Sequence, residues 1–188
     1  MHLDSPSTRR ARPSHERRPP RLWVTRVDDV TRQAVLTLTV AEGQAGFVVA
    51  PRDDLTDIEA DPCSEAHAVL HDGEVVGFYH LDFHPLGIAE RAFPQPSCGL
   101  RSFLIDTRHQ GRGYGRAAMH ALIQDLRARR PDVQRLNLTV NCRNVHARAL
   151  YLAVGFTDAG PLFHGGPNGP QHVMSFDLTR APEKRVNR

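Results

Sequence analysis

The stretch of sequence that decides the fold reads Gln110-Gly111-Arg112-Gly113-Tyr114-Gly115-Arg116. It lies between an apolar run rich in β-forming residues, 100–105, and a run of helical periodicity that begins at Ala117. Three glycines in five positions let the backbone approach a ligand closely at a helix N-terminus, where N–H groups and the helix dipole favour negative charge. Arg112 and Arg116 add two permanent positive charges that can bind phosphate. The stretch therefore predicts a loop that binds a phosphate-bearing cofactor.

Outward from this loop, hydrophobic periodicity and turn residues predict the order β-α-α-β-β-β-α-β-α-β-β. Strands are expected over residues 22–27, 66–70, 74–83, 100–105, 133–140, from 156 onward, and 172–178. Helices are expected over residues 28–38, 54–60, from 117 to just before Pro131, and 144–154, with Gly155 as a C-cap. His71-Asp72-Gly73 predicts a hairpin turn, because glycine tolerates the positive φ that such a turn requires. Residues 85–96 and 160–170 are expected to be loops.

Length and charge indicate one folded domain with basic ends. A chain of 188 residues that is 40% apolar can bury one core and is short for two. Residues 1–21 hold six arginines, several prolines and few large apolar groups, so we predict a disordered basic arm there, a domain over 22–179 and a tail over 180–188. The two ends carry the positive charge, since residues 22–179 hold −4 against +3 for the whole chain. A nucleic-acid-binding domain usually shows the reverse, so we predict no nucleic-acid partner and read the arm as a solvated extension.

The apolar runs and the cysteines indicate the cellular compartment. No stretch approaches the roughly 18 uninterrupted apolar residues of a membrane span, and the arginine-rich N-terminus lacks a secretory signal, which predicts a cytoplasmic protein with no membrane partner. The three cysteines, Cys63, Cys98 and Cys142, are widely spaced and odd in number. That pattern favours reduced thiols over a disulfide framework or a zinc site, so no metal is predicted and Cys98 is not expected to be a nucleophile.

Two kinds of phosphate-binding loop fail at this stretch. A dinucleotide-binding fold requires Gly-x-Gly-x-x-Gly at the first strand-to-helix turn, whereas here Arg116 stands in the place of the third glycine and the loop comes in mid-chain after a hairpin. A nucleoside triphosphate P-loop requires Gly-Lys-Ser/Thr, and the only lysine of the chain is Lys184.

A third kind of loop matches residue by residue. Gln110-x-x-Gly113-x-Gly115 resembles the acyl-CoA pyrophosphate loop of the GNAT family of N-acetyltransferases. A second block, Asn144-Val145-His146-Ala147-Arg148-Ala149-Leu150-Tyr151-Leu152-Ala153-Val154-Gly155-Phe156, resembles that family's Asn-x-x-Ala-x-x-Leu-Tyr-x-x-x-Gly-Phe helix. The resemblance covers about residues 22–178. It implies an α/β (α+β) fold with a mixed, mostly antiparallel sheet of six to seven strands and four helices, in which strands four and five splay apart and admit pantetheine.

The resemblance also implies acetyl-CoA as co-substrate and gives its binding residues. They are Phe103, Leu104, Ile105, Gln110, Gly111, Arg112, Gly113, Tyr114, Gly115, Arg116, Asn144 and Tyr151. Asn144 and Tyr151 are seven residues apart, close to two helical turns, so both can point into one cleft. A tyrosine of pKa about 10 can protonate a departing thiolate whose thiol has a pKa of about 8.5. Tyr151 is therefore the predicted general acid.

The acceptor is expected to be an amine, which is protonated at neutral pH and must lose a proton before it attacks. On the strand over 74–83, His80 and Asp82 share a face near its end and are the candidate bases. A His-x-Asp pair also occurs in non-haem iron sites, but those use another architecture and a distal histidine. Ordinary solvent-facing polar residues remain the alternative.

The acceptor itself stays open between several classes. The segment 40–48 and the run into the glycine loop look like the spermine/spermidine (diamine) acetyltransferase branch, which would place Glu42 and Gln44 against a polyamine. A mildly acidic domain agrees with a polycation. Protein N-termini, other small amines and a non-catalytic acyl-CoA sensor are the alternatives, and a homodimer is one expected assembly.

Overall fold

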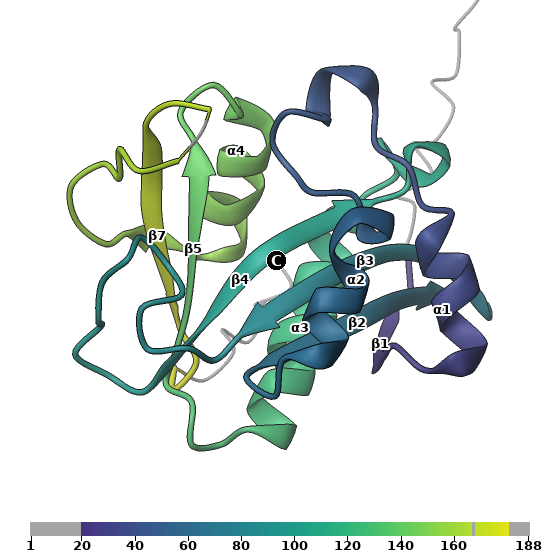
Figure 1. Ribbon diagram of the computed structural model, residues 1–188, viewed down its shortest axis with the longest axis horizontal. Coiled ribbons are helices and arrows are strands. Elements are labelled where there is room, and N and C mark those ends of the chain that lie inside the picture. Colours follow the sequence, from purple (N-terminus) through teal and green to yellow (C-terminus); the bar gives the residue numbers. More distant parts are fainter. Residues whose placement is uncertain (1–19, 167, 181–188) are drawn as a thin grey trace, which may run out of the picture.

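The computed structural model describes residues 20–166 and 168–180 (Figure 1). The arm predicted over 1–21 and the tail predicted over 180–188 lie almost entirely outside the described residues, so both stay predictions.

Seven strands form one sheet in the order β1-β2-β3-β4-β5-β7-β6. They are β1 (Trp23–Arg26), β2 (Ser64–His71), β3 (Glu74–Asp82), β4 (Ser97–Ile105), β5 (Arg135–Asn141), β6 (Thr157–Asp158) and β7 (Gln171–Asp177). Every neighbouring pair is antiparallel except β4 and β5, which are parallel. The predicted mixed, mostly antiparallel sheet is therefore confirmed.

Four α-helices of the described chain cover the two faces of this sheet. They are α1 (Asp29–Leu36), α2 (Pro51–Ala60), α3 (Tyr114–Arg129) and α4 (Val145–Val154). Figure 1 shows α1 and α2 on the near face of the sheet, with α3 behind it. Two apolar clusters follow from this arrangement: Val35, Leu55 and Phe78 belong to one, and Tyr79 and Leu122 to the other. Consecutive residues of β3 thus pack on opposite faces, as strand geometry requires.

Local sequence explains the ends of several elements. Asp28 caps α1, because its carboxylate accepts the Thr31 backbone N–H at 2.8 Å and the Thr31 hydroxyl lies 3.0 Å from the Asp28 N–H. Asp72 and Gly73 both have positive φ, 50° and 85°, as in the tight hairpin turn that the sequence predicted. Gly155 ends α4 with φ 113°, which confirms the predicted C-cap.

Several predicted boundaries were wrong; strands β2 and β4, for example, begin two and three residues earlier than expected, at Ser64 and Ser97. Three other differences have identifiable reasons. Helix α3 begins at Tyr114 rather than Ala117, because Gly113 turns the chain and lets the first turn form inside the glycine loop. Helix α2 begins at Pro51 rather than residue 54, since proline is favourable in a first helical turn. The strand expected from residue 156 shrinks to β6, which lies at the edge of the sheet and pairs only with β7.

The parallel pair β4 and β5 separates along its length. Pairing runs from Ser97 with Arg135 to Leu100 with Leu138 and stops there, although β4 continues to Ile105 and β5 to Asn141. On the other side of β4 the register with β3 shifts between His80 and Leu81. The implied splay is therefore present, and it leaves backbone N–H and C=O groups on the facing edges that a ligand can satisfy.

No helix within the described ranges combines the length and the apolar character needed to cross a bilayer.

Candidate active site

A cavity of about 530 Å³ opens where β4 and β5 diverge. Its walls come from the segment between α1 and α2, the second half of β4, the glycine loop, the end of β5, one side of α4 and the loop before β7. Ten of the predicted cofactor-binding residues line it, namely Phe103, Leu104, Ile105, Gln110, Gly111, Gly113, Tyr114, Gly115, Asn144 and Tyr151. The fold thus brings together predicted residues that lie as far apart in the sequence as Phe103 and Tyr151.

The glycine loop presents open backbone at the N-terminus of α3. Gly111 and Gly113 have φ of 71° and 80°, and a Cβ added at either would meet nothing within 4 Å. Gly113 is the N-cap and supplies no side-chain acceptor, so the first N–H groups of α3 have no capping partner. A Cβ at Gly115 would lie 3.3 Å from Leu150, so this glycine permits the close approach of α3 to α4. The loop therefore fits a phosphate group in both space and polarity.

The two arginines of the loop lie elsewhere. Neither Arg112 nor Arg116 lines the cavity. The Arg116 guanidinium donates to the Ala153 carbonyl at 2.8 Å and so connects α3 to the end of α4. Arg112 is exposed, and the phosphate contacts of both arginines stay predictions.

Helix α4 directs Asn144 and Tyr151 into the same cavity. Asn144 is the N-cap of this helix, and its side-chain oxygen accepts the Ala147 N–H at 3.1 Å. The Tyr151 side chain is 8% exposed, and its ring packs against that of Phe156 at a tilt of 56°, with the ring centroids 5.5 Å apart. The Tyr151 hydroxyl has no hydrogen-bond partner among the described residues. Burial raises the pKa of Tyr151 above its ordinary value, so the phenol keeps its proton at neutral pH. The hydroxyl is available as a proton donor.

Two glutamines connect the glycine loop to the segment between α1 and α2. The side chains of Gln44 and Gln110 form reciprocal amide hydrogen bonds, and Gln110 also donates to the Ile105 carbonyl at 2.8 Å. Gln44 lines the cavity, whereas Glu42, on the same short 3-10 turn, is exposed and does not.

The two candidate bases lie behind the cavity wall. Neither His80 nor Asp82 lines the cavity, although Arg101 does, and Arg101 donates to Asp82 at 3.2 Å. Burial lowers the pKa of His80, whose Nε2 lies 3.0 Å from the Ser64 hydroxyl. Burial raises the pKa of Asp82, but hydrogen bonds from the His84 backbone and ring and from Arg101 outweigh it and hold that pKa below its ordinary value. Asp82 is thus ionised and bonded at neutral pH.

The cavity residues that sequence reasoning did not assign include Gly46, Asn141, His146 and Asn168. Asn168 connects two distant loops, because its amide donates to the Gly46 carbonyl at 2.6 Å and its own carbonyl accepts the Asn141 amide at 2.7 Å. Gly46 and Asn168 lie 122 residues apart, so no local pattern could have found this bridge. His146 lies within the motif that predicted Asn144 and Tyr151. It is four residues before Leu150, so the two side chains share one side of α4, and this spacing could have predicted that His146 lines the cavity.

Comparison with known proteins agrees with this geometry. The model of the Acetyltransferase (GNAT) family matches residues 32–156, and the chain belongs to that family. It is accordingly an N-acetyltransferase that takes acetyl-CoA as co-substrate.

Individual relatives span most of the domain. A spermine/spermidine N(1)-acetyltransferase of Bacillus subtilis is 30% identical over 140 residues, which are 74% of this chain and 90% of that protein. The crystal structure of spermidine N-acetyltransferase from Vibrio cholerae with CoA and spermine superposes with a TM-score of 0.65 at 17% identity, covering 85% of this chain and 96% of that one. The ribosomal-protein-S18-alanine N-acetyltransferase of Escherichia coli gives 0.60 at 19% identity, covering 86% and 97%. The two structures share the fold.

Proposed function

We propose that this chain transfers the acetyl group of acetyl-CoA directly to a primary amine of a polyamine such as spermidine or spermine. The observation that carries the proposal is the 30% identity, over 90% of its length, to the Bacillus subtilis protein named for that activity. Gln44, which the sequence predicts to contact the polyamine, supports the proposal, because its side chain lines the cavity and accepts a hydrogen bond from Gln110 of the glycine loop.

The chemistry of the proposal divides between two sides of the cavity. Acetyl-CoA supplies an activated thioester whose thiolate must leave. On the cofactor side, the open N–H groups at the start of α3 bind the pyrophosphate, and the facing edges of β4 and β5 bind the pantetheine chain. The Tyr151 hydroxyl, which is buried and free of other partners, donates its proton to the leaving sulfur.

On the acceptor side, the ammonium group must lose a proton before it attacks. His80 and Asp82 stay the proposed bases, and because neither lines the cavity, the proton of the ammonium would reach them through a bridging water. Arg101, which lines the cavity, holds the Asp82 carboxylate in place. The distal ammonium groups of a polyamine would pair with carboxylates outside the cavity, since no aspartate or glutamate is among the described residues that line the cavity. Glu42, exposed beside Gln44, is the proposed partner for one of them.

A second candidate function follows from the same lining. A cavity without carboxylates suits an acceptor with a single positive charge, such as the α-amino group of a protein N-terminus or a small monoamine. A polyamine carries positive charges beyond the reacting nitrogen that the protein must bind, and a monoamine does not. Comparing kcat/KM for the two kinds of acceptor therefore distinguishes the two candidate functions.

The test measures CoA release from acetyl-CoA with spermine, spermidine, butylamine, an alanine-initiated peptide and an aminoglycoside. The proposal expects kcat/KM for spermidine to exceed that for butylamine at least tenfold, which corresponds to about 1.4 kcal/mol of added binding. Glu42→Gln should lower this ratio, whereas Glu59→Gln, an exposed carboxylate on α2, should not. Equal values for spermidine and butylamine, or a peptide preferred over both, would instead support the second candidate. A chain that binds acetyl-CoA and releases no CoA with any amine would be a sensor.

A further inference from the structure

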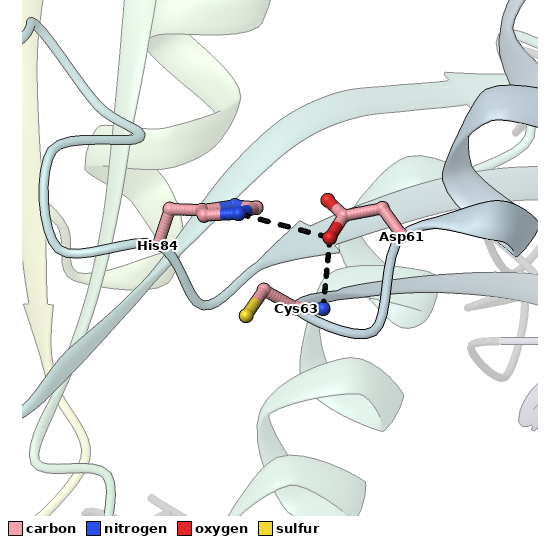
Figure 2. A group of neighbouring side chains, drawn as sticks. All are labelled: Asp61, Cys63 and His84. Atoms are coloured by element: carbon pink, nitrogen blue, oxygen red, sulfur yellow. Dashed lines mark hydrogen bonds and ion pairs between the residues drawn. The ribbon is translucent and has the colours of Figure 1, made fainter.

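Outside the cavity, three side chains with different donor atoms converge where α2 ends and β2 begins (Figure 2). The Asp61 carboxylate, the Cys63 thiol and the His84 imidazole place one oxygen, one sulfur and one nitrogen within 4.8 Å of one another. Asp61 Oδ1 and His84 Nε2 are 3.7 Å apart. We propose that this cluster binds a divalent transition-metal cation, with zinc as the best-suited ion, independently of which amine the enzyme acetylates.

The imidazole is oriented as metal-binding imidazoles usually are. His84 Nδ1 lies 2.8 Å from Asp82 Oδ1, and the His84 backbone N–H donates to the same oxygen at 2.8 Å. The Asp82 side chain is 5% exposed and is fixed further by Arg101. Because a carboxylate only accepts, Nδ1 donates to Asp82, and Nε2 is the ring nitrogen that faces Asp61. A carboxylate behind the second ring nitrogen is the typical support of a metal-bound histidine.

Backbone contacts hold the other two donors. Asp61 Oδ1 accepts the Cys63 N–H at 3.0 Å, and Asp61 Oδ2 accepts the Ser64 hydroxyl at 2.7 Å. The Phe83 N–H donates to the Cys63 carbonyl at 2.8 Å, which extends the β2 and β3 pairing by one step and brings Cys63 beside His84. The turn between α2 and β2 and the residues that follow β3 therefore set the donor positions, as a preorganised site requires.

The spacing and chemistry of the donors suit zinc. A carboxylate oxygen of Asp61 and the Nε2 atom of His84 face each other, and both are atoms that can bind a cation. Zinc bonds of about 2.0–2.3 Å put tetrahedral ligand atoms about 3.3–3.8 Å apart, so the 3.7 Å between Asp61 Oδ1 and His84 Nε2 fits. Thiolate and imidazole ligands disfavour magnesium and calcium. The half-exposed His84 leaves room for a water as a fourth ligand.

The test adds Co²⁺ to the full metal-free chain and follows its optical spectrum, then displaces it with Zn²⁺. If Cys63 is a ligand, a thiolate-to-cobalt charge-transfer band is expected in the near-ultraviolet, with d–d bands in the visible. Substitution assigns the charge-transfer band, because the chain has only three cysteines and Cys98 is buried. Cys63→Ser should abolish the charge-transfer band and weaken Zn²⁺ binding at least tenfold. Cys142→Ser removes a free cysteine of the same burial class and should change neither.

Two further variants test the arrangement rather than the thiol alone. His84→Gln replaces a half-exposed side chain, so the fold should survive while Zn²⁺ binding falls. Asp82→Asn keeps the shape but weakens the support of the imidazole, and should lower Zn²⁺ affinity about 10-fold to 100-fold. Circular dichroism confirms folding of each variant. A cobalt spectrum without a thiolate band, or one that persists in Cys63→Ser, would overturn the proposal.

Discussion

Gln44 and Gln110 exchange two hydrogen bonds through their side-chain amides, at 3.2 and 2.8 Å, and so join the segment between α1 and α2 to the glycine loop. The two residues are 66 positions apart in the sequence. Gln110 also donates to the Ile105 carbonyl, so a change at Gln44 should alter the position of the glycine loop, which is proposed to bind acetyl-CoA.

Gln44→Ala is therefore expected to raise KM for acetyl-CoA about 5-fold to 10-fold with little change in kcat. The loss of two neutral hydrogen bonds costs about 1–1.5 kcal/mol, which is close to one factor of ten. Steady-state kinetics with acetyl-CoA varied at saturating amine measures the effect. The control is Gln33→Ala, on the exposed side of α1, and an equal rise there would contradict this role of Gln44.

Tyr151→Phe should lower kcat by about 10²-fold to 10⁴-fold, the usual contribution of a general acid, and leave KM for acetyl-CoA nearly unchanged. Tyr79→Phe is the matched control, since Tyr79 is buried, its hydroxyl lacks a partner and it does not line the cavity. Wild-type kcat in Tyr151→Phe would remove this hydroxyl from the mechanism.

Gly113→Ala should weaken acetyl-CoA binding for two reasons. A residue with a side chain is strained at φ 80°, and the added methyl group would occupy the open space beside the glycine loop. Gly73→Ala is the control, because Gly73 has φ 85° in the β2–β3 turn and is equally free of neighbours, so this variant introduces the same strain outside the glycine loop. Calorimetric titration with CoA should show a weaker Kd for Gly113→Ala alone, and comparable losses in both variants would mean that strain explains the effect.

Glu65→Gln should destabilise the fold in a pH-dependent way. The hydrogen bond from His67, followed by the charges of Arg129 and Arg26, lowers the pKa of Glu65 from 4.5 to about 2 despite burial. The ionised form therefore stabilises the fold fully above about pH 4.5, and this contribution disappears as the pH falls toward 2.

At pH 7 the cost of Glu65→Gln is expected to be about 1–2 kcal/mol, reduced from the full linkage value because Arg26 is largely solvated. Denaturant unfolding of wild type and variant at several pH values measures it, and the difference should shrink below pH 4.5. Glu59→Gln, which breaks the exposed pair with Arg32, should change stability by less than about 1 kcal/mol. A pH-independent difference for Glu65→Gln would show that packing, and not charge, is responsible.

Local chemistry determined much of this protein in advance. The strand and helix order, the Asp72-Gly73 turn, the Gly155 cap and the glycine loop all depend on φ preferences and on hydrophobic periods of two or 3.6 residues, which act over a few neighbours. The Gln110 and Asn144 motifs carry fixed spacings, so the family and acetyl-CoA could be predicted from them. The start of α3 was missed by three residues because the glycine that turns the chain also begins the helix.

Only the tertiary structure decided how distant segments meet. Strand alternation predicted His80 and Asp82 as candidate bases, but neither lines the cavity, whereas Arg101 on the neighbouring strand β4 does. The Asn168 to Gly46 bridge and the meeting of Asp61 and Cys63 with His84 depend on which strand ends and loops become neighbours. Spacing in the sequence indicated no metal site for the same reason. Two of its donors lie between α2 and β2 and the third follows β3, and these segments become adjacent only after β2 and β3 have paired.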